Sequence, residues 1–167
     1  MRWIWIDRIL ELERGERCVA IKNVSAAEEH LHDHFPGEPI MPAPLIIEGM
    51  AQTAGILVGH ARRFSEKVIL AKIGKATFTR DVGPGMTLVY RAALERIDDA
   101  GASTSGLVSV LEPGAAEMAE APVGSVDLLF SHVDRNMAGV RFPDHNFVFT
   151  DQFMNLIERG GFGEDRA

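Results

Sequence analysis

The chain has 167 residues, of which 46% are hydrophobic and 25% are charged, and its formal net charge is −7. This length and composition are typical of one globular domain with a substantial core. The negative charge argues against a nucleic-acid partner. The single cysteine, Cys18, excludes an intrachain disulfide and favours a reducing compartment. An acidic residue at position 7 ends the first apolar run too early for a signal peptide, so we predict a cytoplasmic protein.

The N-terminal part of the chain is predicted to form a β-hairpin. Loose alternation over 4–13 and β-branched residues over 17–24 indicate two strands, which a glycine-containing turn at 14–16 would join. Residues 25–34 are polar, and we expect them to be irregular.

A long apolar segment follows, in which Glu48 is the only charged residue between Met41 and Gly59. Apolar or small side chains cover every face of a helical period there, which is typical of a buried helix. Pro44 fits the first turn of such a helix. The segment is long enough to span a membrane, but Glu48, Gln52 and several prolines and glycines argue against that.

The second half of the chain alternates between apolar runs and turn residues. The predicted strands are 68–73, with 76–80 as an extension, 87–97, 102–111 and 123–133. One buried helix and several long antiparallel strands define an α+β fold. A single sheet has only one face with which to cover the helix, so we expect the sheet to curl around it.

The last thirty-three residues, 135–167, form a C-terminal extension that we expect to pack on the domain formed by 1–134. Thr150 and Asp151 could cap a short helix over 152–159, which Gly160 and Gly161 would end. Apolar residues would anchor this extension, namely Phe142, Phe147, Phe149 and Phe153. The extension could brace the sheet or cover a substrate entrance, and we favour the brace.

One motif carries a specific resemblance. The run His34-Phe35-Pro36-Gly37-x-Pro39-Ile40-Met41-Pro42, followed by Leu45-Ile46-Ile47-Glu48-x-Met50-Ala51-Gln52, resembles the signature of the 3-hydroxyacyl-[acyl-carrier-protein] dehydratases of fatty acid synthesis. Within that family it is most similar to the branch whose motif carries His and Glu rather than His and Asp. The similarity extends from about Ile6 to about Asp134.

This resemblance implies the hot-dog fold, with a long buried central helix wrapped by a curled antiparallel sheet of five or six strands. It also implies a homodimer whose two sheets run on as one, possibly assembled further into a trimer of dimers. The implied partner is an acyl carrier protein bearing a 3-hydroxyacyl chain, and the implied reaction uses no cofactor and no metal.

Dehydration of a 3-hydroxyacyl thioester needs a base, an acid and a group that polarises the thioester carbonyl. His34 is a plausible base, and Glu48 on an apolar helix would favour its protonated form and could protonate the leaving hydroxyl. By resemblance, the backbone carbonyl of Ile40 accepts a hydrogen bond from the ring nitrogen of His34 that does not act as the base. By resemblance too, the substrate-binding residues are Gly37, Ala43 and Pro44, and the amide of Ala43, helped by Gly37, contacts the substrate carbonyl.

The chain departs from the family pattern at two places that bear on the pocket. Ala43 replaces the usual glycine, and Pro44 follows it without an N–H to donate. Residues 30–33 replace a stretch where the family tends to have paired aromatics and a glycine. These departures alter the pocket rim and leave both catalytic side chains in place.

Several alternatives remain open from the sequence. His34 and Glu48 could form a structural ion pair that only holds the loop to the helix. A hot-dog thioesterase would use a carboxylate-activated water, which the His-Phe-Pro-Gly loop counts against. A non-catalytic module that binds acyl chains or carrier proteins is the third reading. His30, His32 and His34 alternate along the sequence, and three histidines on one face of a strand could bind zinc, although a polar loop is the other reading.

Cys18 lies on a predicted strand, where a cysteine is more typical of a core residue than of a nucleophile.

An acidic carrier protein would need a basic surface for docking. The sequence offers two candidate clusters, each of which could instead be ordinary solvated surface: Arg62, Arg63 and Lys67, and Lys72, Lys75 and Arg80.

Overall fold

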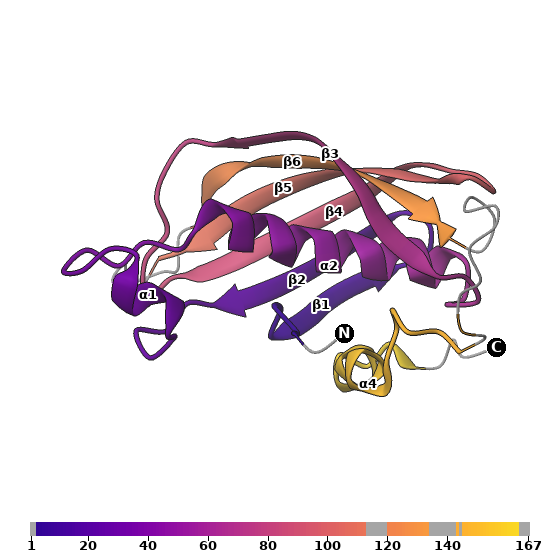
Figure 1. Cartoon of the computed structure of the whole chain (residues 1–167), viewed down its shortest axis with the longest axis horizontal. Coiled ribbons are helices and arrows are strands. Elements are labelled where there is room, and N and C mark those ends of the chain that lie inside the picture. Colours follow the sequence, from indigo (N-terminus) through magenta and orange to yellow (C-terminus); the bar gives the residue numbers. More distant parts are fainter. Residues whose placement is uncertain (1–2, 113–119, 134–142, 144, 164–167) are drawn as a thin grey trace.

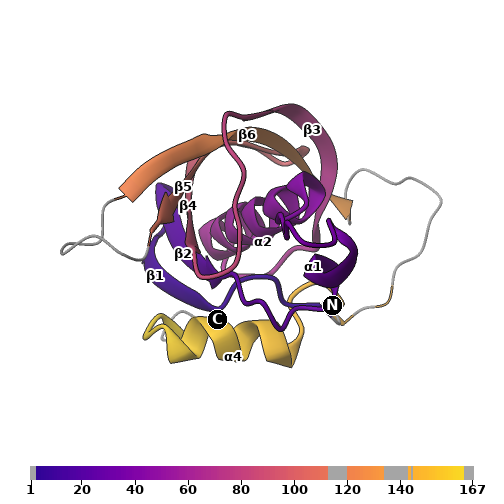
Figure 2. The same ribbon diagram turned by 90° about the vertical axis from the view of Figure 1, so that its left-hand side faces the viewer.

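The computed structural model describes residues 3–112, 120–133, 143 and 145–163. In this part of the chain one six-stranded antiparallel sheet curls around a long helix, and the sheet does not close (Figures 1 and 2). The strand order is β1-β2-β4-β5-β6-β3. The elements are β1 Arg8–Glu13, β2 Arg17–Asn23, α1 His30–Asp33, α2 Ala43–Ala61, β3 Val68–Phe78, β4 Thr87–Ile97, β5 Gly101–Leu111, β6 Glu120–His132 and α4 Asp151–Arg159. The predicted α+β hot-dog architecture is confirmed.

Helix α2 lies in the concave face of the sheet, as its sequence predicted (Figure 2). Pro42 occupies the N-cap position and Pro44 lies in the first turn, where its missing N–H leaves no intrahelical bond unmade. The buried side chains lie all around the helix, including Ile46, Met50 and Leu57. Among the described residues, no helix is both long enough and apolar enough to cross a membrane.

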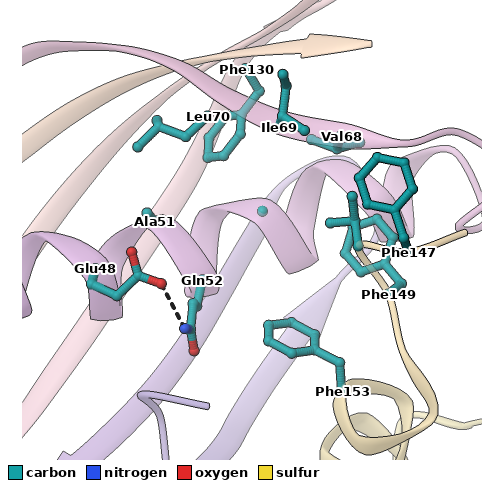
Figure 3. Close-up of a pocket in the computed structure, with 12 residues that line it drawn as sticks. Glu48, Ala51, Gln52, Val68, Ile69, Leu70, Phe130, Phe147, Phe149 and Phe153 are labelled. Carbon is teal, nitrogen blue, oxygen red and sulfur yellow. Dashed lines mark hydrogen bonds between the residues drawn. The ribbon is translucent and has the colours of Figure 1, made fainter. Parts of the chain in front are cut away.

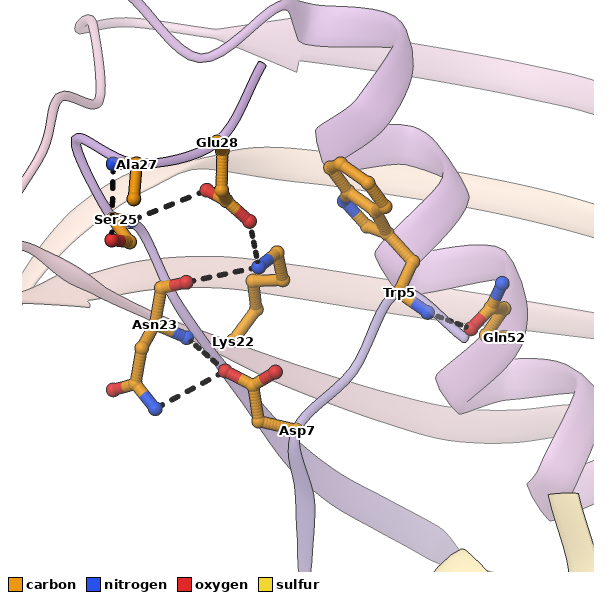
Figure 4. A network of polar contacts seen from close by, with 8 residues as sticks. All are labelled: Trp5, Asp7, Lys22, Asn23, Ser25, Ala27, Glu28 and Gln52. Carbon is orange, nitrogen blue, oxygen red and sulfur yellow. Dashed lines mark hydrogen bonds and ion pairs between the residues drawn. The ribbon is translucent and has the colours of Figure 1, made fainter. Parts of the chain in front are cut away.

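The segment predicted to be irregular contains a short helix, α1. Leu31 is buried, and its N–H donates to the carbonyl of Glu28. The Glu28 carboxylate accepts from the Ser25 N–H and pairs with the buried ammonium group of Lys22 on β2 (Figure 4). The bond between Ser25 and Glu28 has the spacing of a capping box, which is a local signal, whereas the pairing of Glu28 with Lys22 on a strand comes from the fold.

The C-terminal segment, defined here as residues 145–163, packs beside β1 through α4 (Figure 2). The predicted helix is confirmed, and Gly161 ends it with a φ of +88°. Thr150 is at the N-cap position, but its side chain makes no capping hydrogen bond. The buried face of the segment consists of Phe149, Phe153, Leu156 and Ile157, while Phe142 lies outside the described residues.

Two glycines of α2 differ in the space around them, which gives a matched stability test. A Cβ at Gly49 would lie 2.3 Å from the buried ring of Tyr90, whereas a Cβ at Gly55 would lie 3.7 Å from Phe130. We expect Gly49→Ala to lower the free energy of unfolding by about 2 kcal/mol, because overpacking a rigid core is costly. Gly55→Ala should raise it by up to about 1 kcal/mol through helix propensity. Urea unfolding at equal protein concentration measures both, and equal effects would contradict this packing.

Candidate active site

His34 sits in a compact loop just before α2. The N–H of Phe35 donates to the carbonyl of Glu38, and the N–H of Glu38 donates to the carbonyl of Phe35. The Ile40 N–H donates to the His34 carbonyl over 2.8 Å. Gly37 makes this turn possible, since its φ is +84°, which side chains with a Cβ rarely adopt. The ring Nδ1 of His34 lies 2.9 Å from the carbonyl oxygen of Ile40. With Nδ1–H donating to that carbonyl, Nε2 is left with the lone pair that a base needs.

A pocket of about 330 Å³ opens beside this histidine. Ala43 and Pro44, both predicted to bind substrate, line it together with His34, and Phe78 at the end of β3 forms another part of its wall. Gly37, the third predicted substrate contact, shapes the turn and is not among the residues that line this pocket. Ala43 is the first residue of α2, so its N–H lies at the positive end of the helix dipole.

Glu48 lies on α2 about one turn after Pro44, and it is half-buried rather than enclosed. The reason is that the carboxylate faces a pocket instead of the sheet (Figure 3). Its Oε1 accepts a hydrogen bond of 2.7 Å from the side-chain amide of Gln52, one turn further along the helix. The carboxylate is therefore held in one direction by its own helix.

Gln52 is a candidate functional residue, although the sequence singled it out only as part of the motif and as an argument against a membrane span. Its side chain is buried, and its amide also donates to the Trp3 carbonyl over 2.9 Å. Its Oε1 accepts from the Trp5 N–H over 2.7 Å (Figure 4). Gln52 thus ties the Glu48 carboxylate to the N-terminal segment. The only sequence signal was a polar residue four positions from Glu48 on an otherwise apolar helix.

The Glu48 pocket has a volume of about 320 Å³ and a largely apolar wall. Figure 3 shows Glu48 and Gln52 at one end of it and Phe147 and Phe149 at the other. The start of β3 forms part of the wall through Val68. The C-terminal segment packs beside β1, as the favoured brace would, and it also lines the end of this pocket opposite Glu48.

The pocket beside His34 and the pocket beside Glu48 share no lining residue. The first adjoins the end of β3 at Phe78, and the second adjoins the start of β3 at Val68. One chain therefore carries two halves of a possible site at opposite ends of one edge strand.

The alternating histidines do not have the geometry of a zinc site. His30 and His32 lie on helix α1, where residues two apart point in directions about 200° apart. The ring of His30 packs against Trp5, with 5.3 Å between centroids. Cys18 is fully buried on β2, and burial raises the pKa of its thiol to about 12, with a smaller contribution from the Glu11 charge. A thiol that stays protonated is a poor nucleophile.

The two candidate basic clusters differ in what their side chains contact. In the first, Arg62 forms ion pairs with Glu66 and Asp99, and Lys67 is buried. In the second, Lys72 and Lys75 are exposed on β3, while Arg80 pairs with Glu112. The second cluster therefore offers the more accessible positive charge.

Comparison with known proteins identifies the family of this chain. The family model of the FabA-like domain matches residues 3–112. The 3-hydroxyacyl-[acyl-carrier-protein] dehydratase FabZ of Caldanaerobacter subterraneus subsp. tengcongensis is 38% identical over 129 residues, which cover 77% of this chain and 86% of that protein. The chain therefore belongs to the FabA-like family of 3-hydroxyacyl-[acyl-carrier-protein] dehydratases.

Solved structures of similar fold are more distant in sequence. The dehydratase heterocomplex ApeI:P from Xenorhabdus doucetiae matches with a TM-score of 0.56 and 13% identity over 72% of this chain and 92% of that one. A thioesterase family protein from Silicibacter pomeroyi matches with a TM-score of 0.59 and 13% identity over 74% of this chain and 82% of that one. At this identity the likeness establishes the hot-dog fold.

Proposed function

We propose that this protein is a 3-hydroxyacyl-[acyl-carrier-protein] dehydratase of fatty acid biosynthesis. It removes water from a 3-hydroxyacyl thioester and releases the trans-2-enoyl thioester. The observation that carries the proposal is the presence of both halves of an acid–base site on a chain of this family. One half is His34 with Nε2 open to a pocket, and the other is Glu48 facing an apolar pocket.

In the proposed reaction, His34 Nε2 takes the proton from C2 of the substrate. The Nδ1–H···O=C bond to Ile40 fixes the ring tautomer and stabilises the imidazolium that forms. The electron pair of the C2–H bond forms the C2–C3 double bond, and the C3–O bond breaks. Glu48 gives its proton to the departing hydroxyl, so that water leaves, and the two side chains exchange protons with solvent before the next turnover.

The thioester carbonyl gains negative charge while C2 loses its proton. We assign its stabilisation to the N–H of Ala43, because this residue lines the His34 pocket and is the first residue of α2. Ala43 is helical, so its methyl group does not strain the backbone, and the donor that the family's glycine supplies is retained. Pro44 offers no second donor.

A dimer would join the two half-sites. β3 is one of the two edge strands of the sheet, and α4 packs beside the other, β1. Most residues of β3 are exposed, including the apolar side chains of Leu70 and Ile73. Exposed apolar edge strands tend to pair with a second chain. If two copies of β3 pair antiparallel about a twofold axis, Phe78 of one protomer comes beside Val68 of its partner. The His34 pocket of one chain would then adjoin the Glu48 pocket of the other.

We infer that the acyl carrier protein docks beside Lys72 and Lys75, which are exposed on β3. Side chains of a strand project from the faces of the sheet, so these charges stay available when the β3 backbones of two protomers pair. A cytoplasmic location, a trimer of dimers and independence from cofactors remain predictions from sequence.

The direct test is hydration of a trans-2-enoyl thioester, the reverse reaction. Loss of the enoyl absorbance without release of thiol is the expected result. Release of free thiol would instead identify a thioesterase, and binding without turnover would identify a non-catalytic module. Either of these results overturns the proposal.

Gln52 is expected to act as a positioning residue for Glu48. Gln52→Leu should lower kcat by about tenfold to a hundredfold, because hydrogen bonds to charged groups are worth about 1.5–3 kcal/mol. KM should change little, because Gln52 orients the acid rather than the acyl chain. Thr53→Val is the matched control, since it removes a buried hydrogen bond to the Gly49 carbonyl on the same helix. A similar loss of kcat in both variants would indicate a purely structural role.

A further inference from the structure

The far wall of the Glu48 pocket comes from residues beyond the region that the family model matches. That match covers residues 3–112, whereas Phe147, Phe149 and Phe153 belong to the C-terminal segment. Figure 3 shows their three rings turned toward the space beside α2. A segment beyond the matched region therefore shapes the apolar end of the site.

The position of this wall is fixed by specific contacts. The Phe149 ring lies so close to Gly59 that a Cβ there would be 2.4 Å from it, and it packs against Phe64 with 5.0 Å between centroids. The side-chain amide of Asn146 donates to the carbonyls of Phe64 and Glu66 over 3.2 and 3.3 Å. The segment is thus anchored to the C-terminal end of α2.

The anchored wall lies at a defined distance from the acid. Gly59, which Phe149 contacts, follows Glu48 by three turns of helix, or about 16 Å along the axis. Between them the pocket is lined by small residues of α2, Ala51 and Gly55, which leave room beside the helix. An apolar channel of limited length therefore runs from the carboxylate to the phenyl rings.

We propose that the C-terminal segment sets the longest acyl chain that this enzyme accepts, with Phe147 at the far end of the pocket and Phe153 narrowing the way to it. The inference rests on the proposed function, since it takes the ligand of the pocket to be the acyl chain of the thioester. With C3 held at Glu48, the carbons beyond C3 extend along α2 toward the two rings. Acyl chains that end before the rings fit in the pocket, and longer chains are rejected because they collide with the rings.

The test is a chain-length series of trans-2-enoyl thioesters from four to sixteen carbons, compared in wild type, Phe153→Ala and Phe147→Ala. Each methylene that gains a buried place should raise kcat/KM about fourfold. We expect both variants to raise the ratio of kcat/KM for long over short chains by about tenfold or more. This figure assumes that the cavity left by the missing ring partly collapses, so that only some of its volume becomes available to the acyl chain. Phe147 is half-buried, so its variant provides a result even if Phe153→Ala folds poorly.

Two control variants separate a specific wall from general loosening. Leu156→Ala also shortens a buried side chain of α4, but Leu156 does not line the pocket. Asn155→Ala changes an exposed residue of the same helix. Both should leave the chain-length profile unchanged. An unchanged profile in the two phenylalanine variants, or an equal shift in Leu156→Ala, would overturn the inference.

Failure of the proposed function can be told apart from failure of this inference. If wild type turns over no thioester of any length, the proposed function fails. Calorimetry of the binding of unreactive acyl-pantetheine amides of the same lengths then tests whether the phenyl rings set the preferred chain length. A preference that moves to longer amides in Phe153→Ala and Phe147→Ala supports the wall, and an unmoved preference refutes it.

Discussion

His34→Ala should lower turnover of enoyl and 3-hydroxyacyl thioesters by about 10²–10⁴, and Glu48→Gln should do the same. His34→Ala removes the group that accepts the C2 proton. Glu48→Gln keeps the size of the side chain and a hydrogen-bonding group near Gln52 but removes the proton that the leaving hydroxyl needs. Steady-state kinetics with the four-carbon enoyl thioester provides the measurement, and circular dichroism checks that the fold is retained.

Two control variants make this prediction specific. His32→Ala removes an exposed imidazole two residues before His34, and Glu38→Gln neutralises an exposed carboxylate in the same loop. Both should keep near wild-type turnover. If His34→Ala or Glu48→Gln also kept it, the role assigned to that side chain would be rejected, and a structural ion pair would become the better reading.

The second large effect is expected at the edge of the sheet. Ile73 lies at the midpoint of β3, so in an antiparallel pair of two copies it would face its own copy. Ile73→Asp would place two like charges opposite each other and remove apolar surface from the contact, both of which oppose pairing. We expect this variant to be monomeric by analytical ultracentrifugation and to lose activity by about 10² or more, since the two half-sites would separate.

Matched variants test whether pairing is the cause. Ile73→Val keeps an apolar β-branched side chain and should preserve both the dimer and its activity. Leu107→Asp introduces the same charge at an exposed leucine of β5, away from the edge strand, and should preserve them too. A monomeric Ile73→Asp variant with full activity would show that each chain carries a complete site.

The sequence predicted the helices and strands whose burial leaves a periodic pattern of apolar residues. The all-round apolar character of 41–59 indicated α2, and alternation with turn residues indicated the long strands, because burial on one face imposes these periods. The loop bond between His34 and Ile40 came from the resemblance, and the structure contains it. The half-buried state of Glu48 was not predicted, since it depends on the Phe-lined pocket that the distant C-terminal segment helps to form.

Two missed features depend on contacts between residues far apart in the chain. Gln52 bonds to the backbone of Trp3, 49 positions away, and Asn146 bonds to the carbonyl of Phe64, 82 positions away. Helix α1 differs, because the pairing that orders its approach joins Glu28 to Lys22, a strand residue six positions away. A hydrophobic period reports which face of an element is buried, but it does not report which segment covers that face.

The central claim is that His34 of one protomer works with Glu48 of its partner, and mixing the two inactive variants tests it most directly. His34→Ala and Glu48→Gln are unfolded together, refolded as a mixture and assayed against each variant refolded alone. Random reassortment makes half of the dimers hybrid, each with one intact site, so about a quarter of wild-type activity should return. A mixture whose hybrid dimers form, as native mass spectrometry would detect, and yet remain inactive would contradict the account.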